Sequence, residues 1–234
     1  MFTKGEFEMK TLIVLLLFVP VLLAQELKVL NIKGEVKFRT GTSETWSKLT
    51  ESSRLQNEDF ISTGEKSSVQ IKVSNQAFNL TERSAVSLSS IKKMSTDELL
   101  LALAMEDMIN APKNNSKNNS NSTAVYGNKE GQENNLIIKA DDFGVMRLNG
   151  AVELAKNGFK ESAVVYARET YRKYPDSKQI PSYRIFFADI LYEKGLYDES
   201  LGEYLDIAKL DLNDVEKSQI EKQIKIINQL LLNN

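Results

Sequence analysis

Few residues of this chain combine a type and a spacing that could support catalysis or metal binding. The sequence contains no His and no Cys. Imidazole bases, thiolates and the commonest zinc, copper and iron sites are therefore excluded. The chemistry still open to the chain would have to use carboxylates or a serine–lysine pair.

The sequence motifs that could indicate phosphate binding, a serine–lysine pair or paired carboxylates are each better explained by local structure or chance than by a functional site. Gly64-Glu65-Lys66-Ser67 lacks the leading glycine of a phosphate-binding loop, because Asp59 stands there, and a hairpin turn explains it. Ser90 and Lys93 have the spacing of a serine–lysine pair, but no supporting motif follows. Acidic pairs occupy predicted loops or helix starts, where carboxylates favour the helix dipole or solvate a turn: Glu58-Asp59, Asp141-Asp142 and Asp198-Glu199. We predict no catalytic residue, no metal ligand and no cofactor.

Residues 25–94 are predicted to form an antiparallel β domain of five or more strands. Apolar and polar residues alternate there, which places the apolar side chains on one face of each strand. Glycines and short polar runs, at Gly34, Gly41, Gly64 and Asn75, supply the turns. The single tryptophan, Trp46, is either a core residue that covers one end of the sheet, which we favour, or an aromatic platform for a ligand.

A series of short motifs runs through this region. They are Gly34-x-Val36, Trp46, Leu55, Asp59-Phe60-Ile61-x-Thr63-Gly64, Ser67-Ser68-Val69-x-Ile71 and Phe78-x-Leu80. In this order they resemble the FecR-like domain, a family named after the ferric-citrate regulator. The resemblance implies an exported all-β module. One turn differs from the family pattern, which has Asp-Gly-Ser near Ser74-Asn75.

The first 24 residues have the pattern of an export signal peptide. Met9 and Lys10 precede an apolar run from Leu12 to Leu23, shorter than the roughly 20 residues that cross a bilayer. Ala24 is a small residue at the expected cleavage point before Gln25. The alternatives are an uncleaved anchor and a buried core helix. Because no cysteine follows to carry a lipid, we expect a periplasmic or secreted protein with no integral membrane segment after cleavage.

Residues 95–111 are predicted to form an apolar, amphipathic helix. Ser95 and Glu98 have the spacing of a capping box, and Pro112 would stop the helix. A helix so rich in Leu and Met must bury its surface. We expect it to pack on the β domain, with docking to a partner as the alternative.

Residues 112–140 are predicted to be a flexible linker, because they are rich in Asn, Ser, Lys and Gly and offer almost nothing for a core. Within them, Thr123 to Gly127 alternates like a strand. This short run is either an edge strand of the β domain or a chance apolar run in the linker.

Residues 141–234 have helical periodicity in two similar units. The first unit has Gly158, Ala163 and Pro175, and the second has Ala188, Gly195 and Ser200. These positions resemble the inter-helix glycine, the small residues and the closing proline of tetratricopeptide repeats. The resemblance implies stacked helical hairpins, and the stripe of Ile220, Ile224, Ile227 and Leu231 predicts a capping helix from Val215 to Leu232.

Together these features predict an α+β multidomain protein. It has an N-terminal all-β FecR-like domain, a flexible linker and a C-terminal all-α tetratricopeptide-like domain. Residues 27–93 carry 11 Lys and Arg against 7 Asp and Glu, and residues 140–234 carry 13 against 16. This imbalance is far below that of a nucleic-acid-binding protein, so no nucleic acid is expected as a partner.

We expect a non-catalytic exported envelope protein, a scaffold that binds another envelope protein or peptidoglycan. The tetratricopeptide resemblance implies partner binding through the inner-helix positions Ser182, Ile185, Asp189 and Tyr192. Two alternatives stay open. One is a periplasmic sensor or regulator in a FecR-type signalling system, and the other is a cell-wall hydrolase that uses carboxylates.

Overall fold

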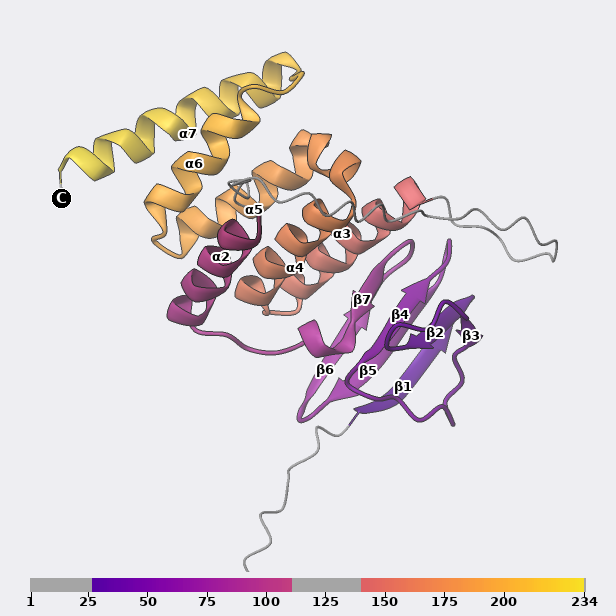
Figure 1. Ribbon diagram of the computed structural model, residues 1–234. Helices are drawn as coiled ribbons and strands as arrows, with labels where there is room; N and C mark the ends of the chain where they lie inside the picture. Colours follow the sequence, from indigo (N-terminus) through magenta and orange to yellow (C-terminus); the bar gives the residue numbers. More distant parts are fainter. Residues whose placement is uncertain (1–26, 111–139, 234) are drawn as a thin grey trace, which may run out of the picture.

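The computed structural model describes residues 27–110 and 140–233, apart from the side chains of Asn110, Ala140 and Asp141 (Figure 1). The predicted signal peptide at 1–24, the predicted strand at 123–127 and all of the predicted linker except Ala140 lie outside the described residues. The described residues form β sheets followed by helices, which confirms the α+β class.

The N-terminal region contains seven strands in two antiparallel sheets. The first sheet has the order β1-β5-β6 and the second has the order β3-β2-β4-β7. The strands are β1 (Leu27–Lys33), β2 (Val36–Thr40), β3 (Ser47–Lys48), β4 (Asp59–Thr63), β5 (Ser68–Val73), β6 (Gln76–Leu80) and β7 (Ala85–Ser87). The predicted antiparallel β region is therefore confirmed. Its division into two sheets was not predicted.

The buried positions and the turns of the β region largely agree with the alternation of apolar and polar residues and with the turn residues in the sequence. Along β5 every second residue is buried, namely Val69, Ile71 and Val73. Gly34 adopts a φ of 74° between β1 and β2. At the turn from β5 to β6 the positive φ, 55°, falls on Ser74 rather than on Asn75.

The turn at residues 64–67 connects the two sheets. It was predicted to be a hairpin turn, but β4 pairs with β2 and β7, whereas β5 pairs with β1 and β6. Lys66 has a φ of 52°, and Ser67 Oγ accepts a hydrogen bond from the Glu35 amide at 2.8 Å. The segment is thus a structural connection that holds the sheets together.

The C-terminal region is helical. It contains α3 (Ala140–Lys156), α4 (Lys160–Lys173), the short 3₁₀ helix η2 (Pro175–Gln179), α5 (Pro181–Glu193), α6 (Tyr197–Ile207) and α7 (Asp214–Leu232). Gly158 lies two residues after the end of α3 and has a φ of 87°, and Gly195 lies two residues after the end of α5 and has a φ of 77°. These left-handed conformations favour glycine, and each lets the chain reverse into the next helix.

The helix α2 (Thr96–Asn110) begins with the predicted capping box. The Ser95 amide donates to Glu98 Oε2 at 2.7 Å, and the Glu98 amide donates to Ser95 Oγ at 3.2 Å. We expected this helix to pack on the β domain. Its main contacts are instead with α4, where Arg172 binds Glu106 at 3.0 Å. The helix reaches α4 because the chain leaves β7 through the 3₁₀ helix η1 (Leu88–Ser90) and continues toward the helical region (Figure 1).

The edge strand β7 lies against α3 and α4. The Tyr166 hydroxyl donates to the Ala85 carbonyl at 3.2 Å, and the Asn149 side chain donates to the Arg83 carbonyl at 2.7 Å. At this contact the backbones nearly touch, because a Cβ added to Gly150 would lie 2.0 Å from the Ala85 oxygen. Only glycine allows α3 to approach β7 this closely.

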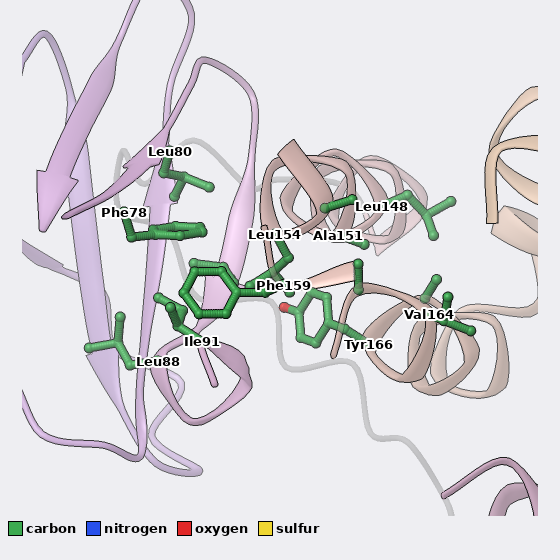
Figure 2. Packing of buried hydrophobic residues seen from close by; sticks show 14 of the residues in the cluster. Phe78, Leu80, Leu88, Ile91, Leu148, Ala151, Leu154, Phe159, Val164 and Tyr166 are labelled. Carbon is green, nitrogen blue, oxygen red and sulfur yellow. The ribbon is translucent and has the colours of Figure 1, made fainter. Parts of the chain in front are cut away.

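The edge strand β6 is covered in the same way by the end of α3. Asn157 accepts a hydrogen bond from the Asn79 amide at 3.0 Å and donates one to the Asn79 carbonyl at 3.0 Å. Its side chain therefore takes the place of a neighbouring strand. Figure 2 shows the apolar part of the contact, in which Phe78 points toward Phe159 and Leu154; the rings of the two phenylalanines lie 6.2 Å apart.

A buried arginine joins the second sheet to the helices. Arg147 is 1% exposed, and its guanidinium lies 5.2 Å from the Phe60 ring and 4.3 Å from the Tyr166 ring. It also donates to Thr170 at 3.1 Å and to Glu169 at 3.3 Å. Two rings, a hydroxyl and a carboxylate together replace the water that this charge loses.

Trp46 also contributes to this junction. The half-buried ring meets Phe143 of α3 edge to face at 5.9 Å, and the Arg39 guanidinium lies 5.0 Å from the Trp46 ring. We expected this tryptophan to cover one end of the sheet. It connects the β region to α3 instead.

One hydrophobic cluster spans both regions. Its buried members include Ile61, Ile71 and Phe78 from the strands and Leu148 and Leu154 from α3. The sequence predicts a boundary between a linker ending at residue 140 and a helical domain starting at residue 141. In the structure the β region and the first helical hairpin share a core, so that boundary does not divide the packing.

The contact at Gly150 can be tested by Gly150→Ala. We expect a loss of about 3 kcal/mol in the free energy of unfolding, because α3 must shift away from β7 to admit the methyl group. Urea denaturation would measure it. Gly202→Ala on α6 is a matched control, since nothing lies within 4 Å of a Cβ there. That control should stabilise the protein by about 0.5–1 kcal/mol through helix propensity. Equal effects of the two substitutions would contradict the assigned contact.

The capping box predicts a specific pH dependence. The hydrogen bond from the Ser95 backbone lowers the pKa of Glu98 below its ordinary value of 4.5. A lowered folded-state pKa stabilises the protein above the unfolded-state pKa, and this stabilisation is lost as the pH falls through the folded-state pKa. Near neutral pH, the wild-type protein should therefore have a larger free energy of unfolding than the Glu98→Gln variant. The two free energies of unfolding should become equal at acidic pH.

Denaturant titrations from about pH 6 to about pH 3 would measure this difference. Asp97→Asn is the control, because Asp97 shares the first turn of α2 but takes no part in the capping box. The Asp97→Asn variant should therefore still lose the stabilisation from Glu98 as the pH falls, as the wild-type protein does. A constant difference between wild type and Glu98→Gln across this range would refute the assignment.

Candidate functional site

The four residues predicted to bind a partner lie along α5, and the structure gives them different surroundings. Ser182 is exposed. Ile185 is 6% exposed and belongs to a second hydrophobic cluster with Tyr204 of α6 and Ile227 of α7. Its side chain is thus core, which corrects the prediction of a binding role. The physical reason is that α7 packs on α6 and α5 and buries this position.

The other two predicted residues are partly engaged within the fold. Asp189 accepts a hydrogen bond from the Tyr204 hydroxyl, and the Tyr192 ring lies 5.5 Å from the Tyr197 ring. Burial raises the pKa of Tyr204, and the hydrogen bond to Asp189 raises it further. Both Asp189 and Tyr192 remain half-buried. Of the four predicted residues, Ser182 has the most accessible side chain.

A buried ion cluster lies beside this surface, between α4, α5 and α6. Glu203 binds Arg184 through Nη2 at 2.9 Å and Arg168 through Nη2 at 2.7 Å. The Arg184 side chain is 3% exposed, so Glu203 is the main compensation for its charge. Burial raises the pKa of the neighbouring Tyr171, and the Glu203 charge adds to this effect. This cluster has no signal in the sequence, because Arg184 and Glu203 belong to different helices.

Glu58-Asp59, Asp198-Glu199 and Ser90 with Lys93 lie on different elements of the described residues. Asp59 is fully buried and caps its own loop, where Oδ2 accepts from the Gln56 amide at 2.8 Å. Asp198 and Glu199 lie in the first turn of α6. The backbone carbonyl of Lys92, which lies between Ser90 and Lys93 in the chain, accepts from Ser162 at 2.6 Å. These residues are therefore distributed over separate parts of the fold.

A surface hollow between α2, α4 and α6 was not foreseen. It has a volume of about 450 Å³ and is called the α2–α6 groove below. Its walls are Leu103 and Asp107 of α2, Arg168 of α4, Glu199, Gly202, Glu203, Leu205 and Asp206 of α6, and Lys209 just after α6. The groove thus combines apolar and charged side chains from helices that are distant in sequence.

Three further observations limit the chemistry of the described residues. No group of three or more Asp and Glu in this part of the chain could hold a metal ion. No helix of the described ranges is long and apolar enough to cross a membrane. No protein-family model, curated protein or solved structure matches the chain.

The buried ion cluster can be tested by Glu203→Gln. We expect a loss of about 3 kcal/mol in unfolding free energy, because Arg184 would remain buried without its main counter-charge. Glu193→Gln is the matched control, since Glu193 binds Lys160 at 2.6 Å on the exposed surface. The control should cost less than about 1 kcal/mol. Thermal and urea unfolding would measure both variants, and a small effect of Glu203→Gln would contradict the role assigned to the cluster.

Proposed function

We propose that the protein is a non-catalytic scaffold of the bacterial envelope, periplasmic or secreted, that binds another envelope protein or peptidoglycan. In this proposal the β region is a FecR-like module, and α3 to α7 form a short tetratricopeptide-like stack. The resemblances in the sequence support both assignments.

The observation that carries the proposal is the arrangement of helices in successive antiparallel hairpins. The pairs α3/α4 and α5/α6 each reverse at a glycine with positive φ, and α7 packs against the second pair. Stacked hairpins present extended surfaces, and such surfaces typically hold peptides or partner helices. The α5 surface at Ser182 and the α2–α6 groove are two places where this stack offers accessible side chains.

The surroundings of the carboxylates favour binding over hydrolysis. A glycosidase needs two carboxyl groups that flank one bond, one of them protonated near neutral pH through burial in an apolar site. The buried Asp59 is inaccessible, and both carboxylate oxygens of Glu203 are occupied by ion pairs with Arg168 and Arg184. Of the carboxylates in the α2–α6 groove, Asp107 is exposed and well solvated. This environment suits charge recognition better than proton donation.

The proposal can be tested with the protein starting at Gln25. Immobilised protein is incubated separately with a detergent extract of bacterial envelopes and with purified peptidoglycan. We expect enrichment of one protein or of peptidoglycan fragments, with several-fold weaker capture by Ser182→Arg if α5 forms the contact. Asn228→Arg, an exposed change on α7, is the control and should leave capture unchanged.

Two results would overturn the scaffold proposal. One is failure to capture any envelope component in either arm. The other is release of sugars or peptides from peptidoglycan, since that would make the protein a hydrolase. Mass spectrometry of the exported protein, with an expected first residue of Gln25, tests the localisation independently.

A further inference from the structure

We propose that the α2–α6 groove binds a lysine- or arginine-rich amphipathic segment of another protein. This proposal deepens the scaffold function and rests on it, because it assigns a partner chemistry to one surface of the stack.

The shape of the groove leaves room for apolar side chains of a guest. Leu205 is 48% exposed on the α6 wall, while Leu103 of α2 is only 5% exposed. Gly202, which also lines the groove from α6, has no atom within 4 Å of an added Cβ. A guest can therefore approach the α6 backbone closely and cover Leu205, which would otherwise stay in water.

The charges of the groove favour a basic guest. Arg168 binds Glu203 at 2.7 Å, although Glu203 also binds the buried Arg184, and Lys209 binds Asp206 at 2.7 Å. The groove lining as a whole carries four acidic and two basic side chains. The remaining two charged residues are Asp107 on the α2 wall and Glu199 on the α6 wall. Neither has a basic partner within the described ranges. One free carboxylate on each wall matches a helix whose apolar stripe is flanked by lysines on both sides.

The composition of α2 argues against two other occupants. Its sequence contains four acidic residues, Asp97, Glu98, Glu106 and Asp107, and no basic residue. An anionic lipid surface would be repelled by these charges. A second copy that paired α2 with α2 would bring like charges together. Electrostatic complementarity thus selects a cationic partner.

The exposed apolar side chains of α2 lie on another part of the same helix. Leu101, Met105, Met108 and Ile109 are each at least 55% exposed and follow helical spacing. None of them lines the groove. Self-association through this stripe would therefore leave the groove open, and a test can separate the two surfaces.

The test uses a fluorescein-labelled helical peptide of leucine and lysine, with a matched peptide that has glutamate in place of lysine. Fluorescence anisotropy with the protein from Gln25 to its end measures binding at several salt concentrations. We expect the lysine peptide to bind, to weaken as salt increases, and to outcompete the glutamate peptide.

Variants assign this binding to the groove. The double substitution Asp107→Asn and Glu199→Gln should weaken the lysine peptide about tenfold, because two solvent-exposed ion pairs are lost. Gly202→Phe should abolish binding by filling the groove. Glu221→Gln on the exposed face of α7 removes an acidic charge elsewhere and should change nothing. Circular dichroism on each variant checks that it is folded.

The outcomes separate this proposal from the scaffold function. Equal binding of the two peptides, or unchanged binding by the folded double variant, overturns the groove assignment even if envelope components are captured. Self-association that Gly202→Phe abolishes would assign the groove to a second copy and would also overturn it. Loss of envelope capture alone, with the peptide still bound in the groove, would count against the envelope scaffold only.

Discussion

The free edges of β6 and β7 impose the constraint on which the rest of this structure depends. Among the described residues, each edge strand has one side with no neighbouring strand in its sheet, and uncovered N–H and C=O groups invite pairing with other chains. Here α3 and α4 cover them, with Asn157 on β6 and with Asn149 and Tyr166 on β7. This cover requires near contact between backbones, which Gly150 permits. The β region therefore depends on the helices for satisfaction of its own hydrogen-bonding groups.

The same junction explains why two arginines are buried or half-buried among aromatic rings. Arg147 lies over Phe60 and Tyr166, and Arg39 lies near Trp46, Phe60 and Phe143. Aromatic faces attract a guanidinium, and hydrogen bonds to Glu169 and Thr170 satisfy the donors of Arg147. Apolar burial alone would hold α3 near the sheets in several orientations. The fixed geometry of these stacked pairs and hydrogen bonds favours one of them.

Because α3 and α4 pack against the sheets, their buried faces are not available to bind a partner. α2 packs on α4, and α7 packs on α6 and α5, so two further faces of the stack are covered. The surfaces still accessible on the helices include the outer surface of α2, the exposed positions of α5, the outer face of α7, and the groove where α2 and α6 approach each other. The proposed function and the proposed partner chemistry follow from these surfaces and from the two carboxylates left without a basic partner there.

The sequence by itself determined the elements that local physics controls. Alternation along β5, the positive φ at Gly34 and Gly158, and the capping box of Ser95 and Glu98 depend on residues close together in the chain. The periodicity of α2 and α5 showed that a face must be buried, but not what would bury it. Only the tertiary structure placed α2 on α4, put Ile185 in the core, and brought Asp107 and Glu199 to one groove. These outcomes arise from contacts between segments that are distant in the sequence. A periodic pattern shows that an apolar face will be buried, but it does not show which element will bury it, because the hydrophobic effect is not directional.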